Sequence, residues 1–178
     1  MRDMMLDLET LSSSPRAAIV QIGACMFDRE TGEIGDRFKV VTAPDLDKYD
    51  VSYDTLHWWF GQSAEAQDAI MPRETLVTIP LNAALEDFLR HFVLHQDTAT
   101  LCVWAMPTTF DNVILENALR TEGFNIPWRH YNARDCRTLF ELAGIAKEDR
   151  VKPELAHDAL SDAIAQAKTV AKAIQRLK

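Results

Sequence analysis

The sequence is poor in cysteine, and its three cysteines, Cys25, Cys102 and Cys136, are widely separated. No CxxC pair is present, so neither a paired-cysteine zinc site nor a disulfide framework is expected. Cys25 and Cys102 lie within apolar runs, which favours buried thiols in a protein of the reducing cytoplasm. A catalytic cysteine stays open as an alternative.

Long apolar runs are also missing. No segment approaches the roughly 20 apolar residues that a membrane helix needs, so a spanning segment is excluded. The short stretch Met4-Met5-Leu6 runs straight into Asp7 and Glu9 without a small-residue cleavage site, so no secretory signal is expected. No internal repeat, low-complexity tract or linker divides the 178 residues, which are enough for one domain with a sizeable core.

An excess of basic residues is absent as well: 19 Lys and Arg stand against 27 Asp and Glu, a formal net charge of −8. Proteins that bind phosphates usually have a basic surface, so two interpretations compete. Either the partner is not nucleic acid, or much of the negative charge lies in a site where metal ions offset it. The acidic balance argues against broad, non-specific binding of duplexes.

Apolar runs separated by turn-forming residues open the chain and predict three consecutive antiparallel strands, at 4–9, 19–27 and 34–41. Helical patterns follow: a short helix capped by Asp54, one capped by Ser63, and a longer one from Pro80. We further expect a strand at 101–104, helices at about 110–123 and 158–177, and a strand edge and a helix within 131–144. This order predicts an α/β fold in which helices cover a mixed sheet.

Asp7 and Glu9 end the first predicted strand. Residues i and i+2 of a strand project from the same face, so the two carboxylates converge. Two anions at the end of a buried strand are costly unless a cation compensates them, and hard oxygen ligands suit Mg²⁺ or Mn²⁺. Composition alone predicts about one Asp-x-Glu triplet in such a chain, so the motif gains its weight from the apolar run before it.

Asp111, His157 and Asp162 lie at predicted element boundaries. Asp111 opens a helix, where it is either an N-terminal helix charge or a third metal ligand. His157 and Asp162 are five residues apart, about 140° around a helix, so they converge only if His157 precedes the helix and Asp162 lies in its early turns. Otherwise His157 is a cap or surface residue and Asp162 a solvated acid. Four carboxylates and a histidine base would suit two-metal cleavage of phosphodiesters.

In this order and combination the sequence resembles the DnaQ-like (DEDDh) 3′→5′ exonucleases, which have the ribonuclease-H-like fold. Within them it is most similar to the phage and bacterial 3′→5′ exoribonuclease group related to the N-terminal region of exonuclease VIII. The resemblance covers essentially the whole chain, and its motifs are Asp7-Leu8-Glu9-Thr10, Ile19-Val20-Gln21-Ile22-Gly23-Ala24, Phe110-Asp111-Asn112-Val113-Ile114-Leu115 and His157-Asp158-Ala159-Leu160-Ser161-Asp162-Ala163. It implies a five-stranded type of mixed sheet and one 3′→5′ exonuclease domain over residues 1–178.

The resemblance also implies a role for each matching residue. Two Mg²⁺ ions, or Mn²⁺ in their place, would be bound by Asp7, Glu9, Asp111 and Asp162. His157 would be the general base, because the five-residue spacing to Asp162 marks the histidine subclass. The residues expected to border the terminal nucleotide are Leu8, Thr10, Phe110, Asn112, Trp58 and Trp59.

Adjacent helical residues point about 100° apart, so we expect one of Trp58 and Trp59 in the core and the other near substrate. Ala105-Met106-Pro107 departs from the family, which often has a Gly-Asn-Gly-like turn there, and this puts the local loop shape in doubt. His91 and His95 have the spacing of a metal pair but lack the acid of an HExxH motif, so a solvated helix face is expected.

The predicted function is hydrolysis of terminal phosphodiester bonds at the 3′ ends of single strands, with RNA favoured over DNA and 5′-mononucleotides released. A homodimer is compatible with the resemblance. One alternative is a catalytically inactive nucleic-acid-binding module on the same fold, although all five site positions are filled. A phosphatase of the haloacid-dehalogenase kind ranks third, because it needs Asp-x-Asp where this chain has Glu9.

Overall fold

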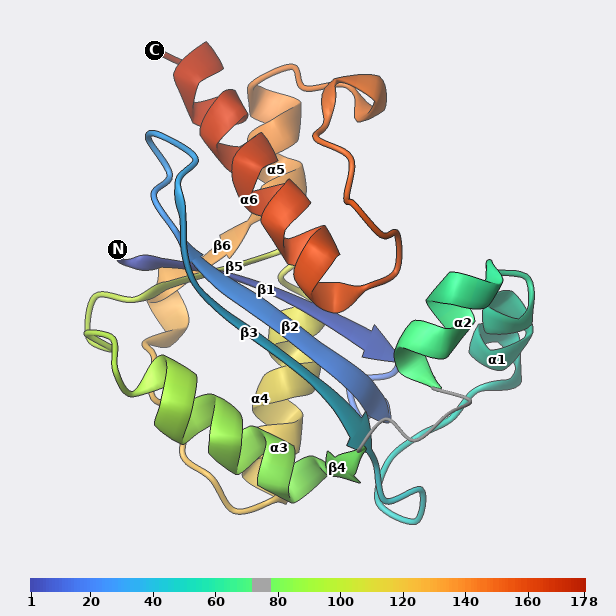
Figure 1. Cartoon of the computed structure of the whole chain (residues 1–178). Coiled ribbons are helices and arrows are strands. Elements are labelled where there is room, and N and C mark those ends of the chain that lie inside the picture. Colours follow the sequence, from blue (N-terminus) through green and yellow to red (C-terminus); the bar gives the residue numbers. More distant parts are fainter. Residues whose placement is uncertain (72–77) are drawn as a thin grey trace.

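The computed structural model describes residues 1–71 and 78–178. A sheet with the strand order β4-β3-β2-β1-β5-β6 forms its centre (Figure 1). The antiparallel meander consists of β1 (Asp3–Thr10), β2 (Ile19–Phe27) and β3 (Ile34–Ala43). Three strands join in parallel: β4 (Ile79–Pro80) next to β3, β5 (Cys102–Ala105) next to β1, and β6 (Ala133–Asp135) next to β5.

The predicted α/β fold with an opening meander and a mixed sheet is confirmed. The sheet has six strands rather than five, because the two-residue β4 extends it beyond β3. The ambiguous region 131–144 is a strand edge followed by a helix, as expected. The other elements are α1 (Tyr53–Phe60), α2 (Ala64–Ile70), α3 (Leu81–Asp87), the π-helix η1 (Phe88–Val93), α4 (Asp111–Thr121), η2 (His130–Asn132), α5 (Cys136–Leu142), η3 (Lys147–Asp149) and α6 (Ala159–Arg176).

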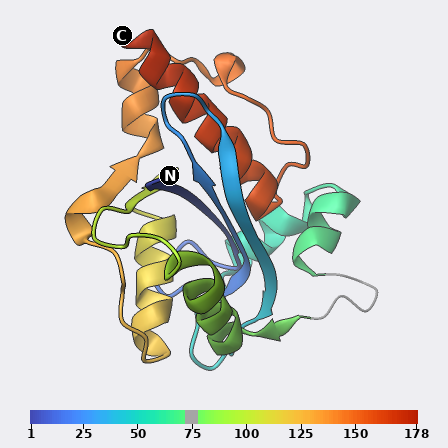
Figure 2. The same cartoon turned by 60° about the vertical axis from the view of Figure 1, so that its left-hand side comes forward.

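Helices cover both faces of the sheet. On one side α3 and α4 pack against it, and on the other lie α5 and α6 (Figures 1 and 2). Successive residues of a strand point to opposite faces, so Met4 and Leu6 enter the core under α3 and α4, whereas Met5 enters the core under α5 and α6. Asp7 and Glu9 continue the Met5 series, so they belong to the face that α6 covers.

Two local predictions about helices need correction. Ser52, not Asp54, is the N-cap of α1, and its hydroxyl accepts from the Thr55 N–H, while Asp54 lies in the first turn. The long helix begins at Leu81 as the Pro80 signal predicts, but it widens into a π-helix at Phe88. The apolar positions predicted for this helix are nevertheless all buried.

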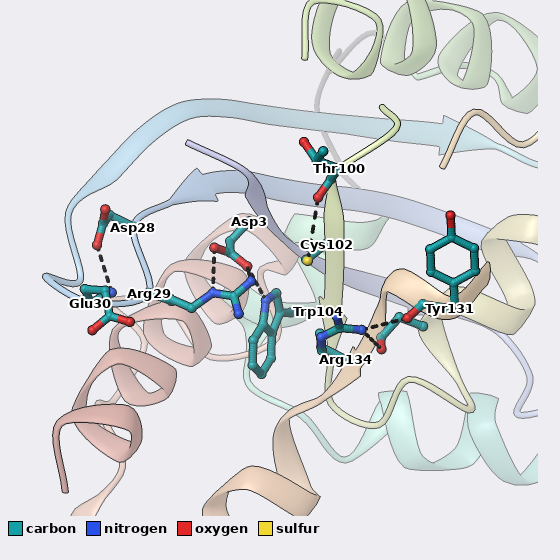
Figure 3. Close-up of polar contacts among 10 residues, drawn as sticks. Asp3, Asp28, Arg29, Glu30, Thr100, Cys102, Trp104, Tyr131 and Arg134 are labelled. Atoms are coloured by element: carbon teal, nitrogen blue, oxygen red, sulfur yellow. Dashed lines mark hydrogen bonds and ion pairs between the residues drawn. The ribbon is translucent and has the colours of Figure 1, made fainter. Parts of the chain in front are cut away.

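A buried ion pair fastens the start of β1, at the opposite end of that strand from Glu9. Asp3 is 3% exposed and accepts from both the Arg29 guanidinium and, at 2.7 Å, the Trp104 indole N–H (Figure 3). The Arg29 guanidinium lies over the Trp104 ring, 5.4 Å from its centre. The contact ties the β2–β3 hairpin to β1 and β5.

The smaller expectations about side chains are also tested. All three cysteines are free and buried, as expected for core thiols. His91 and His95 are exposed, and His91 faces Asp87 one turn earlier at 3.8 Å. Among the described residues no helix is both long and apolar enough to cross a membrane.

Candidate active site

The carboxyl end of β1 carries two acids on one face, as the alternation predicts. Asp7 pairs with Gly23 and Glu9 with Gln21 in the antiparallel register of β1 and β2. Glu9 is 8% exposed, and Asp7 accepts a 2.7 Å hydrogen bond from the side-chain amide of Gln166 on α6. The two acids therefore lie between the sheet and α6.

Asp111 reaches the same end of β1 from the other side. It is the first residue of α4 and is 2% exposed. Its Oδ1 accepts a hydrogen bond from the backbone N–H of Leu8 at 3.1 Å. Because Leu8 stands between Asp7 and Glu9 in the sequence, this bond brings the Asp111 carboxylate beside β1 at the level of those two acids. Its Oδ2 has no hydrogen-bond partner in the described part of the chain. A buried carboxylate oxygen without a protein partner is suited to a cation.

His157 lies in the loop before α6 and Asp162 lies in its first turn, which is the arrangement their spacing requires. Asp158 caps the helix by accepting from the Ser161 N–H at 3.0 Å. The His157 backbone has a φ of 62° and donates its N–H to Asp162 Oδ2 at 2.8 Å. One ligand atom each from Glu9, His157 and Asp162 lie within 4.8 Å of one another. The convergence predicted from sequence is present.

Trp58 and Trp59 divide between surface and core. Trp59 is 2% exposed and donates its indole N–H to the carbonyl of Thr10 at 2.9 Å. Trp58 is 45% exposed, and its ring stands edge-on to the His157 imidazole with the centres 4.9 Å apart. The buried Trp59 ring also stands edge-on to His157, with the centres 6.0 Å apart, so the exposed tryptophan is the nearer of the two to the histidine.

The remaining residues expected to border a nucleotide also lie near this end of β1. Leu8 packs its side chain into the core, while its backbone holds Asp111. Thr10 is buried and donates to the Ser12 carbonyl. Phe110 is half-buried, and Asn112 is 4% exposed with no partner for its amide among the described residues. Contact of these four with a nucleotide stays a prediction.

Sequence reasoning gave no role to three residues that position the site. Gln21 is fully buried, accepts from the first N–H of α6 at Ala159 (2.6 Å), and donates to the Ala69 carbonyl at the end of α2 (2.8 Å). A Cβ on Gly23 would lie 2.2 Å from the carbonyl carbon of Ala159. Gln166 holds Asp7. Gln21 and Gly23 belong to the motif at residues 19–24, and that motif was the signal from which their roles could have been found. Gln166 is a single glutamine inside a helix, and no sequence pattern marks it.

Burial raises the pKa of all four acids, and neighbouring acids raise the pKa of Asp7 and Glu9 further. Burial, then Asp111, Glu9 and Asp162, raises the pKa of Asp7 far above its usual range. Burial, followed by Asp162 and Asp111, raises the pKa of Glu9 to about 8. Burial raises the pKa of Asp111 to about 7 against the opposing Leu8 N–H bond, and burial also raises the pKa of Asp162. The folded chain thus concentrates negative charge that a divalent cation would stabilise.

The mixed sheet has the ribonuclease-H-like fold, and two acids from the end of β1 and one from each of two helix starts lie beside a histidine, which is the arrangement of a DEDDh nuclease. The nuclease domain of 3′hExo, described as a DEDDh family member bound to rAMP, has this fold, with a TM-score of 0.63 at 14% identity over 97% of this chain and 91% of that chain. E. coli exonuclease I in complex with a dA16 oligonucleotide gives 0.66 at 15% identity, over 97% of this chain and 40% of that larger one.

The sequence model of the 3′-5′ exoribonuclease Rv2179c-like domain matches residues 2–174, and the chain belongs to that family. An exodeoxyribonuclease of Enterobacteria phage T4 is 24% identical over 193 residues, which cover 91% of this chain and 84% of that protein. The protein is therefore a 3′-5′ exonuclease acting on nucleic acid, with the fold of the DEDDh exonucleases, which generally use divalent metal ions.

Gly23→Ala tests the close approach of β2 to α6. The added methyl group overlaps backbone, so α6 must shift, and we expect the free energy of unfolding to fall by about 1–3 kcal/mol. Urea denaturation measures it, together with nuclease activity. Gly61→Ala is the control, because a Cβ there meets only one atom at 3.3 Å. An unchanged midpoint for Gly23→Ala would contradict the packing described.

The raised pKa values predict how stability depends on pH without metal. A raised carboxyl pKa means that the folded state binds more protons than the unfolded chain, so stability falls as pH rises from about 4.5, the usual Glu value, through about 8. In EDTA we expect the melting temperature to fall over this range, and Glu9→Gln to reduce the fall. Exposed Glu154→Gln is the control. A melting temperature independent of pH would sink this account.

Proposed function

We propose that the chain removes nucleotides from the 3′ ends of single-stranded nucleic acid, RNA in preference to DNA, and releases 5′-mononucleotides. The observation that carries the proposal is the convergence of Glu9, His157 and Asp162 within 4.8 Å, beside the half-buried Asp7 and the buried Asp111. An inactive binding module would have no need to bring four mutually repelling acids together at one point, with Glu9 and Asp111 buried there.

The residues fit two Mg²⁺ ions, with Mn²⁺ as a substitute. All four acids offer hard oxygen ligands, and the unpartnered Oδ2 of Asp111 is a position that a cation would satisfy. When bound, two such ions activate a water and stabilise the attacking and leaving oxygens of the phosphodiester. Asp7, Glu9, Asp111 and Asp162 are proposed to hold them.

His157 is proposed to take the proton from the attacking water. Its backbone is fixed by the hydrogen bond to Asp162, and its ring lies against Trp58, so its ring stays beside Glu9 and Asp162. An imidazole nitrogen can accept a proton in one step and release it before the next.

The choice of RNA rests on the family rather than on a residue. The family model is that of an exoribonuclease domain, whereas the phage T4 relative is an exodeoxyribonuclease, so the two comparisons favour different polymers. The net charge of −8 disfavours long duplexes and supports short or single strands.

Three coarser properties belong to the same proposal. One sheet and the helices on its faces support a single domain over residues 1–178. Three buried free thiols support a cytoplasmic location. A homodimer rests on the resemblance alone, and light scattering of the purified protein at several concentrations decides it.

Cleavage of matched 5′-labelled single-stranded RNA and DNA tests the proposal. With Mg²⁺ we expect a ladder that shortens from the 3′ end, faster on RNA, and no cleavage in EDTA. Asp7→Asn removes a proposed metal ligand. His157→Ala removes the proposed base, so we expect the cleavage rate to fall by about 10²–10⁴. Exposed His91→Ala is the matched control and should cleave normally. A folded protein that shortens neither polymer with Mg²⁺ or Mn²⁺ would leave the binding module as the better hypothesis.

Trp58→Ala tests the exposed tryptophan as a stacking surface. Loss of one base–aromatic stack costs about 1–3 kcal/mol, so we expect KM for an oligonucleotide to rise about five- to hundredfold. Trp58→Phe should recover most of the affinity. Steady-state kinetics on a single-stranded hexamer give the result, and an unchanged KM for Trp58→Ala would argue that the ring only supports His157.

A further inference from the structure

A basic pocket of about 280 Å³ opens beside the acids. Asp162 and Gln166 of α6 form one wall, and Gln166 is the residue that holds Asp7. The lining also includes Phe140 of α5 and three cations, Lys147, Arg150 and Lys152. Asp162 is its single carboxylate among the described lining residues, so positive charge prevails in a chain whose net charge is −8.

The guanidinium of Arg150 is positioned by Phe140 and is not paired with a carboxylate in the described part of the chain. Its guanidinium lies over the ring of Phe140, 5.2 Å from the ring centre, and the residue is half-buried. Over residues 1–71 and 78–178, no carboxylate lies within 4.0 Å of Arg150, Lys147 or Lys152. The Nε of Arg150 and the Oε1 of Gln166 are buried without a hydrogen-bond partner in that same part. Unpaired buried polar groups are costly unless a ligand meets them.

The segment that carries the three cations is fastened to α6. The Val151 N–H donates to the Thr169 hydroxyl at 3.0 Å, and the Leu155 N–H donates to the Ser161 hydroxyl at 2.9 Å. The Lys172 ammonium donates to the Asp149 carbonyl at 2.6 Å. These hydrogen bonds join the segment to α6, the helix that carries Asp162. The three cations are therefore positioned relative to Asp162 before any ligand binds.

We propose that this pocket binds a backbone phosphate of the substrate strand other than the one that is cleaved. Arg150 presents a planar fork suited to a phosphodiester, and Lys147 and Lys152 add charge at the exposed rim. The pocket adjoins Asp162, so the strand that reaches the acids passes it. The inference rests on the proposed function and adds to it the subsite that makes an oligonucleotide a better substrate than a single nucleotide ester.

A second basic pocket lies across the same segment and serves as a matched control. Its cations are Arg37, Lys39, Lys168 and Lys152, the last of which lines both pockets. Lys39 is already paired with Asp158, and Glu154 adds a further acid. Of the proposed metal ligands, none lies in its lining. Removing the charges of Arg37 and Lys168 changes the net charge as much as removing those of Lys147 and Lys152, and neither Arg37 nor Lys168 lines the proposed subsite.

The test compares a substrate that has one phosphodiester with a substrate that has several. The p-nitrophenyl ester of thymidine 5′-monophosphate has one phosphodiester, and a single-stranded hexanucleotide has several. We expect Arg150→Gln to lower the ratio of the kcat/KM values, hexamer over ester, about tenfold or more, because it removes a charge-assisted hydrogen bond. Lys147→Gln with Lys152→Gln should reduce the slope of log kcat/KM against log salt by about 0.7 for each phosphate that is no longer neutralised.

The controls separate the outcomes. Arg37→Gln with Lys168→Gln should leave the ratio and the salt slope unchanged. If Arg150→Gln melts at a lower temperature, Arg150→Lys and the double lysine variant decide, since those lysines are exposed. An unchanged ratio in every pocket variant, or an equal fall in the control pair, overturns the subsite. If the unaltered protein cleaves neither substrate, the proposed function fails, and anisotropy of a labelled hexamer with Ca²⁺ still tests the pocket by itself.

Discussion

The close approach of β2 to the first residue of α6 is the contact on which the site depends. Gly23 leaves room for the backbone at Ala159, and Gln21 accepts the N–H that starts the helix. With the start of α6 fixed against the sheet, Asp162 falls one turn along it and reaches Glu9, and Gln166 falls two turns along and reaches Asp7. A larger residue at position 23 would move all of these groups together.

The same packing creates an electrostatic conflict. Strand alternation that buries Met5 under α6 also carries Asp7 and Glu9 into that layer, so two anions stand where an apolar residue would stabilise the fold. The raised pKa values of Asp7 and Glu9 are the result of placing these charges together in a buried layer. It also explains why a member of a nuclease family is acidic. Part of the charge of −8 is concentrated where cations are needed, and the pocket at Arg150 is positive.

Strand and helix periodicity made most of the fold readable from the sequence, whereas the site residues were brought together only by the resemblance to a known family. The shared face of Asp7 and Glu9 follows from a period of two. The spacing of His157 and Asp162 allowed them to converge only if His157 preceded the helix, and local sequence did not decide that. The cap at Ser52 was missed because Asp54 is an equally good capping type two residues later, so local chemistry does not choose between them. Gln21, Gln166 and Arg150 act through residues more than 100 positions away or through a pocket, and no local pattern encodes such partners.

His157 combines an unfavourable backbone with a fixed position. A φ of 62° is in the left-handed region, which costs a non-glycine residue roughly 1–2 kcal/mol, so the surrounding structure must hold it there. The hydrogen bond from its N–H to Asp162 does so, and Asp162 is itself held by the helix that Gly23 admits. The proposed base is therefore fixed through a proposed metal ligand rather than independently of it. A change that moves Asp162 should release His157 as well, so the two groups form one unit and the effects of removing each should not add.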